Sequence, residues 1–164
     1  MQQHVSITHN SVLIVEIHPY FPQKRLVEWV QAQDIHITAY SSFGPGSYVS
    51  LTNDGRTAAP LLQHDVIKSI AEKKGRSPAQ VLLRWAIERH IAVIPKSSHA
   101  ERMRSNLDLF DWSLDAEDKK QIETLDQGLR FNGLYTSFGS RHGINNAYAI
   151  LDPDSYGFDL PLFS

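Results

Sequence analysis

The segment of the chain that most clearly carries chemistry is residues 94–106, Ile-Pro-Lys-Ser-Ser-His-Ala-Glu-Arg-Met-Arg-Ser-Asn. In it, Lys96 and the hydroxyls of Ser97 and Ser98 precede a helix that we expect to carry Arg102 in its first turns. The amide groups and dipole of a helix N-terminus attract anions. Lysine adds a compact positive charge, and arginine adds a planar guanidinium that can donate two parallel hydrogen bonds to a phosphate. The segment predicts a phosphate site. The alternative is a surface lysine and arginine beside an ordinary capping box, Ser98 to Glu101.

A second candidate motif follows an apolar run that ends at Tyr40. The residues after it are small or flexible, namely Ser41, Ser42 and Gly44. An aromatic ring at the end of a strand, followed by a loop containing glycine, offers a platform beside a backbone that can approach a ligand. Taken alone, this motif fits a core tyrosine before a turn better than a ligand site.

A third motif, Glu16 and His18, receives no catalytic role, because a lone histidine is more often a packed residue than a base. The other histidines lack metal-ligand spacing, so we expect no metal site. The chain contains no cysteine, which excludes disulfides, thiolate ligands and a cysteine nucleophile. It also lacks Gly-x-Gly-x-x-Gly and Gly-x-Ser-x-Gly, which argues against a Rossmann site and a hydrolase nucleophile.

These motifs must be positioned by alternating strands and helices. Apolar, β-branched runs at 12–17, 35–40 and 91–95 predict buried parallel strands. Helical patterns lie between and after them, at 24–33, at 64–74 before Gly75, from a Ser77–Gln80 capping box onward, after Ser98, and at 115–126. Alternation of this kind indicates βαβ units. Since three parallel strands leave two open edges, we expect them to be part of a larger sheet or barrel.

The bulk composition is that of an ordinary globular protein. Of 164 residues, 41% are hydrophobic and 21% charged, and the formal net charge is −2. This balance gives no reason to expect a nucleic-acid partner or an acidic membrane surface. We see neither a signal peptide nor an apolar run long enough to span a bilayer, so we expect a cytoplasmic protein.

Together the segments resemble the aldo-keto reductase family, and most closely its fungal xylose-reductase-like branch. The resemblance rests on Glu16, His18-Pro19-Tyr20, residues 37–45, 77–86 and 94–97, Arg102, Asn106, residues 128–132 and residues 160–163. It implies an α/β fold that is a partial (β/α)8 TIM barrel, with strands six, seven and eight at 12–17, 35–40 and 91–96 and a C-terminal tail. The chain then divides into a divergent segment 1–11, an NADP-binding part of the barrel 12–132, and a tail 133–164.

The resemblance also implies NADPH as cofactor. It implies that Tyr40 stacks on the nicotinamide, that Ser41, Ser42 and Gly44 line the pyrophosphate, that Lys96, Ser97 and Arg102 hold the 2′-phosphate, and that Asn106 contacts the adenine. Ser98 stands where the branch often has asparagine, and we include it among the cofactor-binding residues. Ile14 replaces the usual glutamine that holds the carboxamide. Ser50 stands where dual-cofactor members carry glutamate, which favours NADPH over NADH.

The activity implied by the resemblance is hydride transfer from NADPH to an aldehyde or ketone, including aldoses such as xylose. The family's catalytic Asp, Tyr, Lys and His belong to the first half of the barrel, and no residue of this chain matches them. We therefore assign no catalytic residue and expect no turnover unless a missing half completes the substrate site. Two alternatives remain: a non-catalytic NADP(H)-binding or interaction module, and an unstable fragment that unfolds with weak cooperativity, aggregates, or dimerises through exposed sheet edges.

Overall fold

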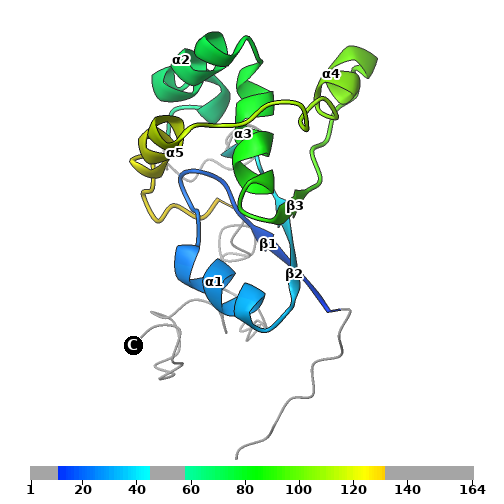
Figure 1. Cartoon of the computed structure of the whole chain (residues 1–164), viewed down its shortest axis with the longest axis vertical. Helices are drawn as coiled ribbons and strands as arrows, with labels where there is room; N and C mark the ends of the chain where they lie inside the picture. Colours follow the sequence, from blue (N-terminus) through cyan, green and yellow to red (C-terminus); the bar gives the residue numbers. More distant parts are fainter. Residues whose placement is uncertain (1–10, 45–57, 132–164) are drawn as a thin grey trace, which may run out of the picture.

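The computed structural model describes residues 11–44 and 58–131, in which strands alternate with helices as the sequence predicts (Figure 1). The elements are β1 (Val12–Glu16), α1 (Lys24–Ala32), β2 (His36–Tyr40), the 3-10 helix η2 (Leu61–Gln63), α2 (Asp65–Lys74), α3 (Pro78–Ile87), β3 (Ile91–Val93), α4 (Ala100–Ser105) and α5 (Ala116–Glu123). Most of the segment 1–11, Ser50 and the tail 133–164 lie outside the described residues. No helix in the described ranges is both long and apolar enough to cross a bilayer.

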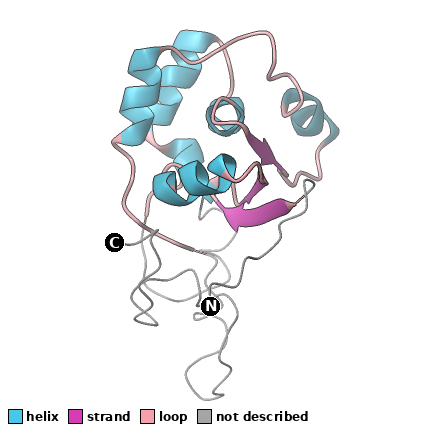
Figure 2. Cartoon of the chain, turned by 60° about the horizontal axis from the view of Figure 1, so that its bottom comes forward, coloured by secondary structure: helices cyan, strands magenta, loops and turns pink. Residues whose placement is uncertain are grey.

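The three strands form one parallel sheet in the order β1-β2-β3, which confirms the α/β prediction. The register aligns Leu13, Ile37 and Ile91 in one row, and Ile37 and Ile91 are almost fully buried. The neighbouring row points to the opposite face, because successive side chains alternate across a strand. Among the described elements, helices α1, α2, α3 and α5 pack on the face that carries the first row (Figure 2).

The core lies between this covered face and helices α1, α2, α3 and α5. Each helix presents an apolar stripe to it, and the buried members include Val27, Val30, Ile67, Ile70, Val81, Leu82, Trp85 and Ile122. Helix α3 is buried along most of its length because it is wedged between the sheet and α2, as its nearly continuous apolar sequence predicts.

Two predicted helix ends are confirmed. The hydroxyl of Ser77 accepts a hydrogen bond from the Gln80 amide at 3.2 Å, while the Gln80 side-chain oxygen accepts from the Ser77 amide at 2.9 Å. Pro78 occupies the first turn of α3, where its missing N–H costs nothing. Gly75 ends α2 at φ 62°, a left-handed conformation that suits glycine.

The predicted capping box at Ser98 is wrong. Helix α4 begins at Ala100 with His99 as its N-cap, and no side chain caps it. Instead, the hydroxyl of Ser97 accepts a hydrogen bond from the His99 amide at 3.2 Å, which forms a serine turn before the helix. Since α4 has six residues and buries none of them, packing does not fix its start, and this local turn decides it.

Two other element ends also differ from the prediction. Strand β3 stops at Val93, short of Pro95, which cannot donate to a ladder. Helix α5 spans Ala116–Glu123, and Asp115 and Asp118 form a capping box at its start.

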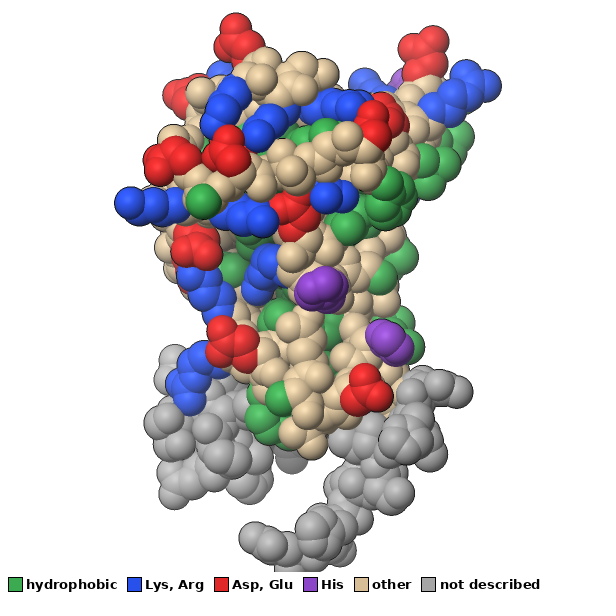
Figure 3. Space-filling model, viewed as in Figure 1, with side chains coloured by type: hydrophobic (Ala, Val, Ile, Leu, Met, Phe, Trp, Pro, Cys, Tyr) green, Lys and Arg blue, Asp and Glu red, His purple; other side chains and the backbone are tan. Residues whose placement is uncertain are grey.

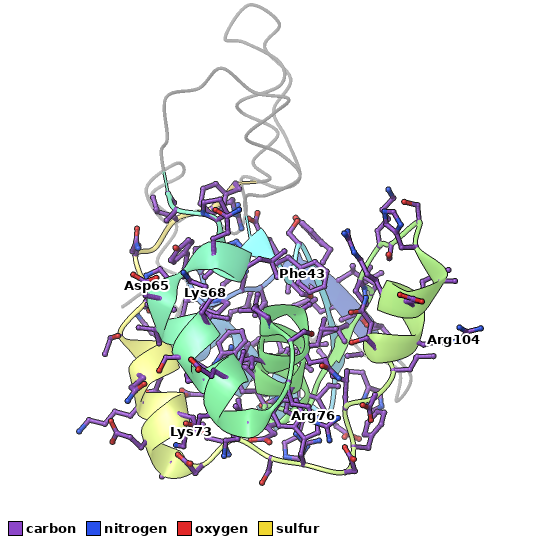
Figure 4. The ribbon with its side chains drawn as sticks, turned by 90° about the horizontal axis from the view of Figure 1, so that it is seen from above. Phe43, Asp65, Lys68, Lys73, Arg76 and Arg104 are labelled. Carbon is purple, nitrogen blue, oxygen red and sulfur yellow. The ribbon has the colours of Figure 1, made fainter. Side chains whose placement is uncertain are left out.

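Helix α5 is held against α2 by a cluster of charges on the surface. Lys73 lies 2.7 Å from Asp115 and 2.8 Å from Asp118, and Lys74 contacts both carboxylates. Burial opposes ionisation of Asp118, but hydrogen bonds from Lys73, the Asp115 amide and Lys74 outweigh it and lower its pKa. Figure 4 shows Lys73 near the C-terminal end of α2 and the Asp65–Lys68 ion pair near its N-terminal end. In that pair, the hydrogen bond from Lys68 lowers the pKa of Asp65.

Candidate functional site

A cavity of about 610 Å³ opens where the loop after β2, the start of α3 and the loop between β3 and α4 meet. It contains five of the nine residues predicted to bind a cofactor. Its lining is Phe43, Leu62, Ser77, Pro78, Ala79, Lys96, Ser97, Ser98, His99, Arg102, Ser105 and Asn106. The residues of the predicted phosphate motif extend from the loop after β3 into α4, and they line this one cavity.

Among the described residues, the lining of this cavity has two permanent positive charges, Lys96 and Arg102, and no carboxylate. Both side chains are exposed, and within the described part of the chain neither forms an ion pair. A second cavity, between α1, α3 and α5, has the opposite character. There Lys24, Arg89 and Lys119 are balanced by three glutamates. Of these two cavities, the first is the one in which the described residues present an uncompensated positive charge to an anion.

Helix α3 adds a part of this site that the sequence did not predict. Its N-cap Ser77 and its first residues, Pro78 and Ala79, form part of the cavity wall. The N-terminal end of a helix of ten residues carries a partial positive charge, which favours an anion nearby. The Ser77–Gln80 capping box identified the helix start from the sequence, but not its place beside Lys96.

The four remaining predicted residues, Tyr40, Ser41, Ser42 and Gly44, do not line the cavity. They form the end of β2 and a tight turn in which the Gly44 amide donates to the Ser41 carbonyl at 2.8 Å. Phe43, which lies within this turn and was not predicted, reaches the cavity wall (Figure 4). The turn therefore reaches this cavity through Phe43, while the other four predicted residues stay outside its lining.

Two features of the turn concern ligand binding. The hydroxyl of Ser42 is buried and has no hydrogen-bond partner among the described residues, which is costly unless a ligand or solvent satisfies it. Gly44 adopts φ 69°, and a Cβ atom there would lie 2.7 Å from Leu61 Cδ1. Glycine is therefore favoured at this position by its backbone angle and by the buried Leu61 side chain, which a Cβ would force to shift.

Glu16 and His18 are buried at the end of β1 and organise the chain there. One oxygen of Glu16 lies 2.9 Å from His18 Nε2 and accepts the Phe131 amide at 2.8 Å. The amides of Gln127 and Leu129 both donate to the Tyr20 carbonyl. These contacts bind the segment that follows α5 to the end of β1. Across residues 11–44 and 58–131, no group of acidic and histidine side chains forms a metal site.

Comparison with known proteins decides the family. A model of the aldo/keto reductase family matches residues 3–127. The chain belongs to the aldo/keto reductase family. The curated relatives place it in the fungal xylose-reductase-like branch, as predicted.

The relatives are much longer than this chain. A 4-dihydromethyl-trisporate dehydrogenase of Mucor mucedo is 51% identical over 153 residues, which are 93% of this chain and 42% of the relative. An NAD(P)H-dependent D-xylose reductase of Aspergillus niger is 46% identical over 93% of this chain and 42% of its own length. An NADPH-dependent D-xylose reductase of Meyerozyma guilliermondii is 56% identical over 74% and 39%.

A solved structure shows the same architecture. The crystal structure of Gox0644 in its apo form superimposes with a TM-score of 0.60 and 36% identity, covering 70% of this chain and 38% of that chain. In this comparison, as with the curated relatives, the chain spans about two fifths of the length of the protein it matches.

Proposed function

We propose that the cavity binds the adenosine end of NADPH and that its 2′-phosphate lies between Lys96, Ser97 and Arg102. The observation that carries the proposal is a cavity whose described lining holds two cations and the start of α3, and no carboxylate. A phosphate dianion is the ligand that such a lining suits best. Relatives named as NAD(P)H- or NADPH-dependent reductases support a nicotinamide cofactor.

The rest of the cofactor would extend from this cavity along the end of β2. Asn106 would contact the adenine and Ser98 would lie at the cavity edge, since both line it. Ser41, Ser42 and Gly44 would line the pyrophosphate, where the buried Ser42 hydroxyl, which has no partner among the described residues, would gain one. Tyr40 would stack on the nicotinamide. The 2′-phosphate, which NADH lacks, would be the group that this chain recognises most strongly, so we propose a preference for NADPH.

The activity that we propose for the whole fold is reduction of an aldehyde or ketone, including aldoses such as D-xylose. When bound, NADPH supplies the hydride. The residues of this chain bind and orient it, and the group that donates a proton to the carbonyl oxygen belongs to the part of the fold that this chain does not match. We therefore expect the 164-residue chain alone to bind nucleotide without turnover.

The sheet face that the described helices leave open supports the finer fold proposal that β1, β2 and β3 are strands six to eight of a (β/α)8 barrel. Along this face Val12 and Ile14 are 54% and 59% exposed, and Ile94 just after β3 is 57% exposed. Ile14 is aligned with Thr38 and Ala92 in the register. In a closed barrel, the inward-facing side chains of neighbouring strands fill this space in layers.

The experiment is a calorimetric titration of the chain with NADPH, NADH, 2′,5′-ADP and 5′-AMP. We expect 2′,5′-ADP to bind at least tenfold more tightly than 5′-AMP, because only it carries the phosphate that the two cations would hold. NADPH should be preferred over NADH for the same reason. Equal affinities within each pair would refute the phosphate assignment, and no binding of any of the four would refute the nucleotide site.

A further inference from the structure

Ser105 ends a short basic sequence on α4 and also lines the cavity that we propose for the cofactor. Arg102 stands three residues before it and Arg104 directly before it, in the sequence Arg-Met-Arg-Ser. Arg102 and Ser105 share one face of the helix, and both line the cavity together with Lys96. Protein kinases select substrates by charge pattern, and arginines at these two positions suit a kinase with an acidic substrate groove. The hydroxyl of Ser105 is therefore a candidate for phosphorylation.

The helix that carries Ser105 is accessible to an enzyme. Helix α4 has six residues, none of them buried, and no side chain caps its start. A helix of this length is marginal without packing, so it can open locally at a small cost in free energy. Both arginines are exposed. Figure 3 shows basic side chains on the surface at the end of the molecule that carries α4, and in Figure 4 Arg104 points away from the body of the molecule.

Ser77 also lines the cavity and follows a basic residue, Arg76, but the fold protects it. Its hydroxyl accepts a hydrogen bond from the Gln80 amide at 3.2 Å and donates one to the Gln80 side-chain oxygen at 3.1 Å. It begins α3, most of whose residues are buried. A kinase would have to unfold a core helix to reach Ser77, whereas Ser105 needs only the short α4 to open.

We propose that Ser105 is a phosphorylation site and that its phosphate closes the cavity to NADPH. A kinase transfers the γ-phosphoryl group of ATP to the Ser105 oxygen. The bond between the γ-phosphorus and the bridging oxygen of ATP breaks, the bond to the serine oxygen forms, the hydroxyl proton is released, and ADP leaves.

The phosphoserine then competes for the cations of the cavity. It carries a charge of about −1.5 to −2 and three acceptor oxygens. Lys96 and Arg102 line the same cavity as Ser105, so the phosphate pairs with them and lowers the net charge of the described lining from about +2 to about zero. This inference rests on the proposed function, because these two cations are the groups that would hold the 2′-phosphate.

The test treats the 164-residue chain with Mg-ATP and the catalytic subunit of an arginine-directed kinase, the cyclic-AMP-dependent protein kinase. Mass spectrometry of peptides locates the phosphate, which we expect on Ser105. In calorimetry the phosphorylated chain should bind 2′,5′-ADP at least tenfold more weakly than the untreated chain, and removal of the phosphate by alkaline phosphatase should restore binding. In the matched control, Ser105→Ala, kinase treatment should leave the affinity for 2′,5′-ADP unchanged.

A second measurement follows the phosphate itself and does not depend on nucleotide binding. Phosphorus NMR gives the second pKa of the phosphoserine, which is ordinarily about 6. Lys96 and Arg102 should lower this pKa, and Lys96→Ala should raise it again, because a nearby positive charge favours the dianion. Arg102 is kept because the kinase recognises it. His99 also lines the cavity and titrates in the same range, so every sample carries His99→Asn, which keeps a residue suited to the N-cap of α4.

Three results would overturn the inference. They are phosphate on other residues with none on Ser105, undiminished binding of 2′,5′-ADP by the phosphorylated chain, and a phosphoserine pKa that Lys96→Ala leaves unchanged. The two proposals can fail separately. Nucleotide binding by the untreated chain with no phosphate on Ser105 would refute only the modification. A phosphoserine pKa that depends on Lys96, in a chain that binds no 2′,5′-ADP when untreated, would refute the nucleotide site and support the pairing of the phosphate with the cavity.

Discussion

Replacing Arg102 by alanine should separate recognition of the 2′-phosphate from binding of the rest of the nucleotide. Arg102 lines the cavity with Lys96, and neither has an ion pair within the described part of the chain. A hydrogen bond to a charged group contributes about 1.5–3 kcal/mol. Because Arg102 is exposed, solvent weakens the contact, and we expect the lower end of this range.

A loss of about 1.5 kcal/mol corresponds to roughly tenfold weaker binding. Calorimetry should therefore show this loss for 2′,5′-ADP and NADPH, and none for 5′-AMP. Lys96→Ala should act in the same way. The double variant should lose less than the two single losses combined, because both cations would contact one phosphate.

The matched control is Arg104→Ala, which removes the same charge from the same helix. Arg104 does not line the cavity, and in Figure 4 its side chain points away from the body of the molecule. If Arg104→Ala weakened 2′,5′-ADP as much as Arg102→Ala did, a general electrostatic attraction would explain the binding and the specific phosphate contact would be refuted. Raising the salt concentration should reduce any such general contribution first.

Three further predictions follow from the fold and the site. Gly44→Ala should lower the free energy of unfolding by more than about 1–2 kcal/mol in chemical denaturation, since the left-handed backbone is strained and the new Cβ meets Leu61 at 2.7 Å. Gly75 has a similar φ, and a Cβ there would meet no atom within 4 Å, so Gly75→Ala should lower the free energy of unfolding only by the cost of the left-handed backbone. Equal losses for the two substitutions would refute the close contact at Gly44. Asp118→Asn should lower the free energy of unfolding by about 1–2 kcal/mol at pH 7, because it weakens the contacts with Lys73 and Lys74. Because the pKa of Asp118 is lowered in the folded state, the wild-type chain should have its full additional stability above the ordinary aspartate pKa of about 3.9 and should lose it in acid. A difference in the free energy of unfolding between the two chains that stayed constant down to low pH would contradict this. Finally, the isolated chain should not accelerate NADPH oxidation with D-xylose or glyceraldehyde, and protein-dependent turnover would show that it carries its own proton donor.

Features that depend on a few adjacent residues could be predicted from the sequence. The start of α3 follows from Ser77, Pro78 and Gln80, whose mutual hydrogen bonds need no distant partner. The predicted start of α4 is wrong because Ser97 forms a turn with the His99 amide instead of a cap at Ser98, and the helix has no buried residue to fix its start. Where local signals compete, tertiary packing has to decide, and at α4 packing is weak.

The candidate site divides in the same way. Lys96, Ser97 and Arg102 stand close together in the sequence, so their residue types and spacing are enough to predict a phosphate site. Phe43 and the start of α3 lie far from this motif along the chain and join it only through the packing of β2, β3 and α3. No spacing rule connects segments so far apart, and neither could be assigned to the site from the sequence.

The sequence by itself determined the parallel α/β pattern, the helix caps that rest on adjacent residues, and the basic motif that follows the third strand. These features depend on side-chain periodicity and on hydrogen bonds between residues that lie close together in the sequence. Only the tertiary structure decided which cavity Lys96 and Arg102 share, that α3 begins in its wall, and which sheet face the described helices cover. These depend on how helices pack across the sheet, and packing is a property of residues brought together from the whole chain.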